Sequence, residues 1–380
     1  MKEKILAALL NANGAISGEE IAKTLGVSRN AVWKAIKSLK SDGYIIDGVS
    51  RIGYTIQNPR DVLSAESIKM YLRSQGEAAI GKAATARTKA TDFQKTASIQ
   101  GKSSANTQKT TDTEKSDDTL LADGRKHDEY YKIVILPETD STNNYAKQLA
   151  ANGGAEGTVI LTDYQSGGRG RRGRTFLSPK GKGLYMSVIL KPLPDISDSI
   201  KITSFAAIAA ARAIDAQTGA VTKIKWVNDL FLGGKKICGI LTEALMDYET
   251  MIPSYIILGI GINLRHTDFP PDIAKIATSI EDETGTAPDK NLLAANILYN
   301  LKNLEEEIKS GAFLNECKGR SIVIGNEITV NRGNESYEAT AIDLDKNGGL
   351  IIERQSGNGI LSKNRRETLS SGEVSIRVKK

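Results

Sequence analysis

The stretch GGRGRRGRTFLSPKGKG, residues 167–183, is the part of the sequence from which the rest is best understood. It contains six glycines and six lysines or arginines, and no acidic residue. Glycine lets the backbone approach a ligand closely, and arginine and lysine supply charge and donors that suit phosphate. Ordering such a loop costs about 10 kcal/mol of gross backbone entropy, so we expect it to be mobile until an anion organises it. By itself the stretch fits a flexible basic surface loop or an RNA-binding arginine-glycine segment as well as it fits a loop that binds an anion.

Predicted strands lie on both sides of this loop, so the loop belongs to a larger sheet. Runs rich in β-branched and apolar residues alternate with one long apolar helix and several turns, which indicates a mixed α/β domain over 130–317. The expected elements are strands at 131–136, 158–165, 184–190, 224–229 and 255–264, a helix around 205–214 and a hairpin turn at 233–241.

Two polar features interrupt these apolar runs. Ser141, Thr142 and Asn143 stand where the first strand turns into a helix, and such side chains either cap the helix or line a polar pocket. Lys225 lies within a predicted strand, where an unanswered charge is unfavourable unless a ligand or an acid faces it. This favours a functional role for Lys225.

Residues 1–62 predict a winged helix-turn-helix domain. Ser17 and Glu20 form a capping box for a second helix that ends at Gly26, and Ser28 begins a third, basic helix. A short turn between two helices, followed by a small hairpin, is typical of DNA-binding modules, although such folds also bind proteins. The candidate DNA contacts are Ser28, Arg29, Asn30, Trp33, Lys34, Lys37 and Arg51.

The remaining segments have simpler interpretations. A linker helix is expected at 63–75, and 76–129 is a Ser-, Thr-, Lys- and Ala-rich insert that we expect to be disordered, with no function assigned. Short strands separated by turns at 318–380 predict a small barrel.

Composition limits the class of protein. The chain has 380 residues, 40% of them hydrophobic, which suits two or three domains, and its net charge of +6 weakly favours a phosphate-bearing partner. Two cysteines and two histidines argue against a disulfide framework or a metal cluster held by histidines. The apolar run at the start is too short and too acidic for a signal peptide, so we expect a cytoplasmic protein with no membrane association.

Five motifs, in their order and spacing, give the chain a specific resemblance. They are STN at 141–143, Gln165 leading into GGRGRRGR at 167–174, KWxND at 225–229, KKICGIL at 235–241 and GIGINL at 259–264. In these the chain resembles biotin–protein ligases, and its winged helix makes it similar to the bifunctional kind that also represses the biotin operon. The fold class implied is α+β: a winged helix-turn-helix, a central mixed-sheet ligase domain like that of class II aminoacyl-tRNA synthetases, and a C-terminal SH3-like barrel.

The resemblance implies a two-step ligation with biotin and MgATP as substrates and a lysine of a biotin carboxyl carrier protein as acceptor. It also implies a homodimer that forms on adenylate binding and then binds operator DNA. It implies no metal ligand from the protein beyond the Mg²⁺ that accompanies ATP. The residues implied for biotin are Ser141, Thr142, Asn143, Gln165, Gly168, Arg169, Gly170, Arg171 and Lys225. Those implied for the nucleotide are Arg171, Arg174, Asn228, Asp229, Lys236, Asn263 and Phe269.

Within that set we expect Lys225, Arg169 and Arg171 to be catalytic, with Lys225 orienting the carboxylate and neutralising the α-phosphate. Val227 departs from the family's usual proline, which implies a looser presentation of this lysine. Three alternatives remain: a ligase whose winged helix is vestigial or repurposed, a biotin-sensing transcription factor without catalysis, and a lipoate ligase.

Overall fold

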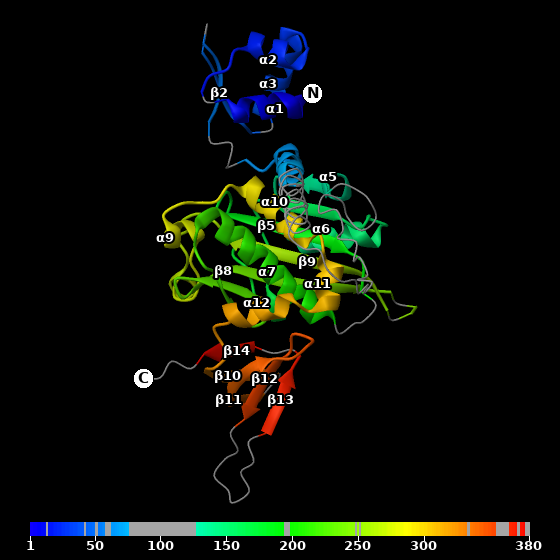
Figure 1. Ribbon diagram of the computed structural model, residues 1–380, viewed down its shortest axis with the longest axis vertical. Coiled ribbons are helices and arrows are strands. Elements are labelled where there is room, and N and C mark those ends of the chain that lie inside the picture. The colour runs from blue at the N-terminus through cyan, green and yellow to red at the C-terminus, as the bar shows by residue number, and fades with distance from the viewer. Residues whose placement is uncertain are drawn as a thin grey trace, which may run out of the picture.

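The chain folds into three parts stacked along its long axis (Figure 1), as seen in a computed structural model. The structure describes residues 1–12, 14–41, 43–49, 52–57, 62–75, 127–193, 198–247, 249–250, 252–332, 335–354, 365–370 and 373–376. Arg51 and residues 76–126 of the predicted insert lie outside these ranges. Residues 127–129, also assigned to the insert, belong to the short helix α5 (His127–Tyr130).

The first part is the predicted winged helix. It contains α1 (Lys2–Asn11), α2 (Gly18–Leu25), α3 (Arg29–Ser41) and an antiparallel hairpin of β1 (Ile45–Val49) and β2 (Gly53–Gln57). The Ser17 hydroxyl accepts a hydrogen bond from the Glu20 amide at 3.0 Å, and Gly26 closes α2 in the left-handed conformation at φ 65°. Both caps are those that the sequence predicts.

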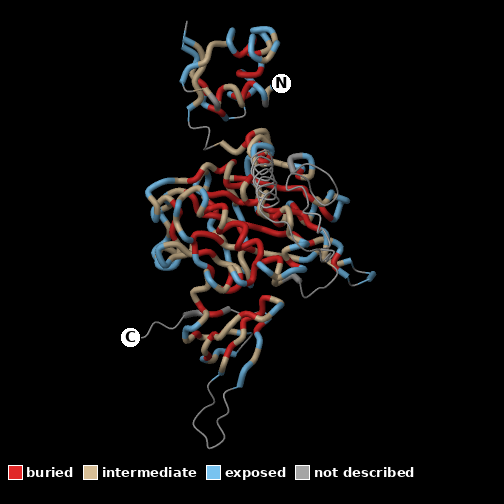
Figure 2. The backbone as a smooth tube through the Cα atoms, viewed as in Figure 1, coloured by how far each residue is buried: buried red, intermediate tan, exposed pale blue. Residues whose placement is uncertain are grey.

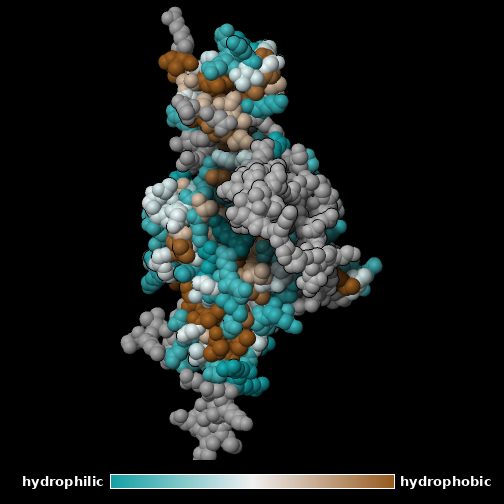
Figure 3. Space-filling model, viewed as in Figure 1, coloured by the Kyte–Doolittle hydropathy of each residue, from teal (hydrophilic) through white to brown (hydrophobic). Residues whose placement is uncertain are grey.

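Helix α3 separates its residues into two faces. Val32, Ile36 and Leu39 are buried in a core that belongs to this domain alone. The predicted DNA contacts in α3 are all exposed, and Trp33 is 52% exposed with the Lys37 ammonium 5.5 Å from its ring centroid. The wing carries exposed apolar side chains, and a hydrophobic patch lies at that end of the molecule (Figure 3).

A helix at 65–75 joins the winged helix to the central domain. Its Ile68 and Leu72 are fully buried in the core of the central domain. Asn291 fixes the start of this linker, because its Oδ1 accepts from the Ser64 amide and its Nδ2 donates to the Val62 carbonyl, each at 2.8 Å.

A seven-stranded mixed sheet forms the central domain. The strand order is β3-β4-β5-β9-β8-β7-β6, with β3 and β4 parallel and the other neighbours antiparallel. The strands are β3 (Lys132–Ile135), β4 (Thr158–Thr162), β5 (Gly183–Leu190), β6 (Lys223–Lys225), β7 (Asp229–Leu232), β8 (Lys235–Met246) and β9 (Pro253–Asn263).

Residue alternation along these strands gives the sheet two different faces. Even-numbered residues of β5 and β9, such as Met186 and Leu258, join one large core under α7 (Asp198–Thr218) and α10 (Lys290–Leu301). Odd-numbered Ile189 and Ile257 meet α6 (Thr142–Ala151) in a smaller cluster. Figure 2 shows the buried residues concentrated along this sheet and the helices beside it.

Two elements differ from the expected ones. The predicted strand 224–229 is instead a tight hairpin, because residues 226–228 form a turn between β6 and β7. The sequence also predicts one helix that begins near Leu292 and ends at 313–318, but this helix is divided at Gly311 (φ 67°) and near Lys302. It becomes α10, α11 (Leu304–Ser310) and α12 (Phe313–Arg320).

The C-terminal part is a five-stranded antiparallel sheet of order β13-β12-β11-β10-β14. Its strands are β10 (Glu327–Arg332), β11 (Glu335–Leu344), β12 (Leu350–Arg354), β13 (Arg365–Leu369) and β14 (Glu373–Ile376). The sequence predicts the first strand of this part at 321–324, but Ser321 forms only an isolated bridge with Ile224 and bends and a turn follow it. Val330 and Ile352 belong to the same apolar core as the central domain, so the two parts pack as one unit.

Helices α8 (Pro271–Ala274) and α9 (Ile280–Thr284) complete the described elements. None of the helices within the described ranges combines the length and the apolar character that crossing a lipid bilayer requires.

Replacing Asn291 by alanine should loosen the linker while leaving the central fold intact. Two hydrogen bonds to the linker backbone are lost, each contributing about 0.5–1.5 kcal/mol. Amide exchange of residues 64–72 should therefore accelerate. Asn300→Ala is the matched control, since this asparagine of the same helix donates to the Ala209 carbonyl inside the domain. Equal exchange of the linker in both variants would contradict the prediction.

Candidate functional site

The face of the central sheet that α6 covers in part has glycines where side chains would otherwise stand. Register places Tyr185, Gly261, Gly239 and Asp229 side by side across β5, β9, β8 and β7. The next row along the sheet is Ser187, Gly259 and Leu241. A hollow therefore runs over the middle of the sheet, and its floor is largely backbone.

Asn143 fills part of this hollow from the first turn of α6. Its Nδ2 donates to Glu243 Oε2 at 2.8 Å and to the Leu241 carbonyl at 3.3 Å, and its Oδ1 lies 2.6 Å from Ser187 Oγ. A side chain on Gly259 would overlap this amide. The absence of a Cβ at Gly259 thus allows Asn143 to lie against the sheet.

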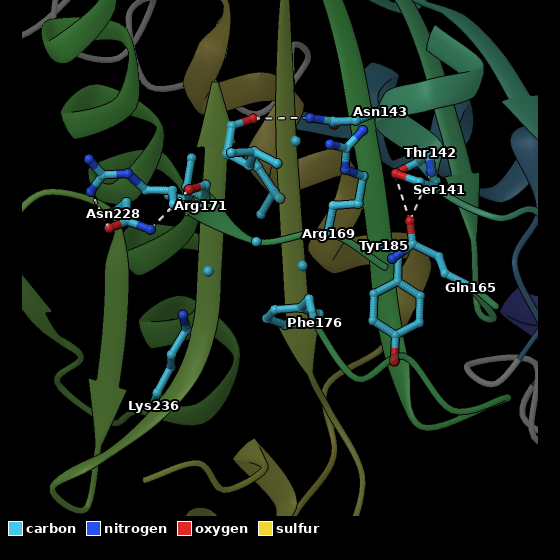
Figure 4. Close-up of a pocket in the computed structure, with 17 residues that line it drawn as sticks. Ser141, Thr142, Asn143, Gln165, Arg169, Arg171, Phe176, Tyr185, Asn228 and Lys236 are labelled. Carbon is cyan, nitrogen blue, oxygen red and sulfur yellow. Dashed lines mark hydrogen bonds between the residues drawn. The ribbon is translucent and has the colours of Figure 1, made fainter. Parts of the chain in front are cut away.

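The polar end of the hollow is built from the predicted STN residues and Gln165. Ser141, Thr142 and Asn143 are all buried, and Ser141 does not use its hydroxyl to cap α6. Gln165 Oε1 accepts from the amide and the hydroxyl of Thr142, at 2.8 and 3.2 Å (Figure 4). Of the two interpretations of these side chains, the structure favours a polar pocket over a simple helix cap.

Phe176 occupies the other row of glycines. A Cβ on Gly261 would stand 2.8 Å from the Phe176 ring, and one on Gly239 would stand 3.2 Å from it. The ring meets Tyr185 edge-on at 6.3 Å between centroids, and the Lys236 ammonium lies 5.9 Å from its centroid. In Figure 4 Phe176 lies between Lys236 and Tyr185.

The glycine-arginine loop folds back on itself above this floor. Gly170 donates to the Arg174 carbonyl at 2.7 Å and Phe176 to the Gly168 carbonyl at 2.9 Å. Arg172 adopts φ 57° in the turn between them, residues Arg171–Gly173. The backbone of the loop thus closes a short hairpin through its own hydrogen bonds.

The loop's arginines are held by polar partners. Arg169 donates to Asn144 Oδ1 and Arg171 to Asn228 Oδ1, each at 3.1 Å. Asn228 is fixed in turn, because its Nδ2 donates to the Ile240 carbonyl at 3.1 Å. Arg174 is exposed and lines the outer part of the site.

Two adjoining cavities result. The inner one is lined by Ser141–Asn143, Gln165, Arg169 and the glycine rows. The outer one has a largely apolar wall and includes Arg174, Asp229, Asn263, Phe269 and Ile273. Gly170, Arg171, Phe176, Asn228 and Lys236 line both. The two cavities therefore meet at a pair of cations, Arg171 and Lys236.

Lys225 does not line the cavities, although Arg169 and Arg171, the other two predicted catalytic residues, do. It lies on the edge strand β6 and lines neither cavity. Its ammonium lies 5.9 Å from the centroid of Phe231, whereas Lys236 forms an ion pair of 2.7 Å with Asp229 at the cavity junction. Lys236, assigned from the sequence to the nucleotide, lines both cavities. Val227 is buried in the core, away from the cavity lining.

Electrostatics favour ionised carboxylates beside the inner cavity. Burial disfavours the charge on Glu243, but hydrogen bonds from Asn143 and Lys147 and nearby cations outweigh it and lower its pKa. The hydrogen bond from Asn144 lowers the pKa of Asp140. Burial raises the pKa of Tyr185 well above its ordinary value, so its hydroxyl stays neutral. Cys238 and Cys317 are buried and unoxidised, and burial raises the pKa of both thiols.

The outer cavity is bordered by the segment after β9. Asn263 is buried and donates to the Thr278 carbonyl at 3.0 Å. His266 in this segment lies 2.8 Å from Asp282, whose hydrogen bond raises the pKa of the imidazole. Among the described residues no cluster of histidine, cysteine, aspartate and glutamate is arranged to hold a metal ion.

Several residues of the site were not predicted from the sequence, among them Phe176, Tyr185, Ser187 and Glu243. The available signal was the spacing of Gly259 and Gly261, two residues apart, which puts both on one face of a strand. A strand face without side chains leaves space that another side chain or a ligand must fill.

The winged helix, the central mixed sheet and the C-terminal sheet each match a known domain model, and the match of the central domain indicates a ligase of the biotin/lipoate class. Residues 135–263 match the biotin/lipoate A/B protein ligase family model, 2–55 an HTH domain model and 323–377 a biotin protein ligase C-terminal domain model.

Whole-chain relatives share this order of domains. The chain is 28% identical to the bifunctional ligase/repressor BirA of Bacillus spizizenii, over 90% of each chain. It is 26% identical to that of Escherichia coli, over 98% of this chain and 96% of the relative. The biotin protein ligase of Aquifex aeolicus in complex with biotin and ATP superposes with TM-score 0.54 at 25% identity, covering 65% of this chain and 99% of the other. Over most of its length the chain is thus similar to biotin protein ligases, above all to the bifunctional ligase/repressors.

Gly259→Ala should weaken biotin binding by about tenfold, because the added methyl group overlaps the Asn143 amide and displaces it, at about 1–3 kcal/mol. Titration calorimetry measures this. Gly319→Ala is the control, since nothing lies within 4 Å of its Cβ position. Unchanged affinity in Gly259→Ala would show that Asn143 does not shape the pocket.

Proposed function

We propose that this protein is an ATP-dependent biotin–protein ligase that also represses biotin genes when it carries the adenylate. The observation that supports the ligase activity best is the junction of two cavities at Arg171 and Lys236. A carboxylate in one cavity and a phosphate in the other would meet there. The family relationship and the relatives' names favour biotin over lipoate.

The inner cavity takes biotin. The Ser141 and Thr142 hydroxyls and the side-chain amide of Gln165 lie at its polar end, and hydroxyl and amide groups suit the donors and acceptor of the ureido ring. Phe176 and the glycine floor provide an apolar surface for the ring and the acyl chain. Gly168, Arg169 and Gly170 close over the bound vitamin.

The outer cavity takes ATP with its Mg²⁺. Its apolar wall, which includes Phe269 and Ile273, suits the adenine, while Arg174 and Asn263 lie where the ribose and phosphates would pass. Asp229 is the acidic residue available to support the metal–phosphate complex.

In the first step, the biotin carboxylate attacks the α-phosphorus of ATP and pyrophosphate leaves, which gives biotinyl-5'-AMP. Arg171 and Lys236 stabilise the charge that builds on the α-phosphate. In the second step, the ε-amine of a carrier-protein lysine attacks the acyl carbon, AMP leaves and the amine gives up a proton. Positioning suffices for both steps, and no covalent enzyme intermediate is needed.

The repressor activity is carried by the exposed face of α3. Arg29, Asn30 and Lys34 face solvent on a basic helix, as groove-binding helices require. A single unit of this size binds weakly, so we expect the adenylate to promote a homodimer that occupies a two-fold symmetric operator. These substrates and this target place the activity in the cytoplasm.

Biotin-dependent exchange of labelled pyrophosphate into ATP tests the ligase activity directly. Lys236→Met should lower the kcat/KM of this exchange by about 100- to 1000-fold, because a cation at the α-phosphate is lost. Lys225→Met should keep most of the activity, because that side chain lines neither cavity. The opposite ranking of the two variants would return the catalytic role to Lys225, and no exchange by the wild type would end the proposal.

Operator binding should depend on both adenylate and salt. With biotinyl-5'-AMP present, gel-shift titrations on a palindrome from the protein's own biotin operon should give a negative slope of log affinity against log salt. Lys34→Ala should reduce the magnitude of that slope by about 0.9 for each DNA phosphate that the lysine neutralises. Lys132→Ala, which removes an exposed charge from the central sheet, is the control. Absence of any shift at low salt would favour a ligase with a repurposed winged helix.

A further inference from the structure

The turn between β6 and β7 connects the ligation site to the C-terminal sheet. Trp226 at its apex is 6% exposed, and its indole Nε1 donates to the Gly348 carbonyl at 2.9 Å. Gly348 lies in the turn between β11 and β12 of the C-terminal sheet. Two residues after Trp226, Asn228 accepts the hydrogen bond from Arg171 at the cavity junction. The β6–β7 turn thus contacts both the cavity junction and the C-terminal sheet.

The Gly348 carbonyl is held firmly in place. The Asp345 carboxylate accepts from the amides of Asn347 and Gly349, both at 2.8 Å, and Gly348 itself adopts φ 79°. A Cβ on Gly348 would stand 3.3 Å from Ile200, so this turn is seated directly against α7. The acceptor for Trp226 is therefore rigid.

A second contact joins the same two parts. Arg172, next to Arg171 in the glycine-arginine loop, donates through Nη2 to the Asn331 carbonyl at the end of β10, at 3.1 Å. The loop is thus fixed on one side by Asn228 and on the other by the C-terminal sheet. Neither Trp226 nor Arg172 lines the inner cavity.

We infer that Trp226 is a positioning residue for ligation: through its bond to Gly348 it uses the C-terminal sheet to hold the turn that carries Asn228, and so Arg171. The expected change in the KM for MgATP rests on the proposed function. The expected change in amide exchange of the glycine-arginine loop does not depend on it. Losing one buried hydrogen bond of about 1 kcal/mol corresponds to about fivefold in an equilibrium constant. The C-terminal sheet thus contributes to activation of the nucleotide through the position of Arg171.

The test compares two aromatic variants in the full chain. Trp226→Phe keeps an aromatic ring but loses the N–H donor. Tyr131→Phe is the matched control, because Tyr131 is buried in the same core and its hydroxyl donates to the Leu298 carbonyl, also at 2.9 Å. We expect Trp226→Phe to raise the KM for MgATP about fivefold in pyrophosphate exchange, with kcat and the affinity for biotin alone within twofold. Tyr131→Phe should leave all three within twofold.

A third variant alters the turn from the C-terminal side. Asp345→Ala releases two amides of the β11–β12 turn and leaves every residue of the central domain unchanged. It should raise the KM for MgATP in the same direction. Trp33 and Trp226 are the two tryptophans of the chain, so in a Trp33→Phe background Asp345→Ala should also shift the emission of Trp226 to longer wavelength.

Each outcome decides one point. A raised KM in Trp226→Phe and Asp345→Ala, with Tyr131→Phe unchanged, supports the inference. If the wild type catalyses pyrophosphate exchange, an unchanged KM for MgATP in Trp226→Phe overturns the inference. A rise of equal size in the KM of Tyr131→Phe also overturns it. If the wild type shows no exchange, the proposed function fails. Amide exchange of residues 168–176 then decides the inference, since faster exchange in Trp226→Phe than in Tyr131→Phe supports the positioning role and equal rates overturn it.

Discussion

The structure of the site depends on one constraint: three positions on the cavity-facing side of the central sheet carry no side chain. Gly239, Gly259 and Gly261 leave the backbone bare, so Phe176 and Asn143 can lie directly on the strands. Both side chains line the inner cavity. Any larger residue at the glycines would raise Phe176 or Asn143 away from the sheet and fill the space in which a ligand would lie.

The same floor brings charged and polar partners together in pairs. Lys236 is held by Asp229, and Arg171 is held by the amide of Asn228, at the point where the two cavities meet. Both cations are thus placed before any phosphate arrives, which reduces the reorganisation needed when charge develops during reaction. The hairpin closure of the glycine-arginine loop contributes to the same preorganisation, because it fixes the backbone on both sides of Arg171.

The accessory parts are attached to this site in different ways. The C-terminal sheet shares the apolar core of the central domain and contacts the loop and the β6–β7 turn. The winged helix has its own core and reaches the central domain through the linker, where Asn291 holds the backbone of Val62 and Ser64. A DNA-binding unit joined in this way keeps its own core, whereas the C-terminal sheet depends on the catalytic domain for part of its packing.

The sequence alone was sufficient for elements whose signals are local. The caps at Ser17 and Gly26, the solvent-facing side of α3 and the strands around the glycine-arginine loop depend on hydrogen bonds and periodicities within a few residues, and the structure confirms them. The order of the motifs also identified the family. Local signals were weaker where a turn replaced a strand, because residues 224–229 have the composition of a strand while their conformation is set by the packing of Trp226 and Val227.

Only the tertiary structure decided which lysine faces the cavity. Lys225 and Lys236 both lie at strand ends, and nothing within either segment distinguishes them. The difference comes from strand order, since β6 is the edge strand while β8 lies between β7 and β9, next to the glycine floor. Strand order is set by contacts between residues far apart in the chain, and those contacts also placed Phe176 over Gly239 and Gly261.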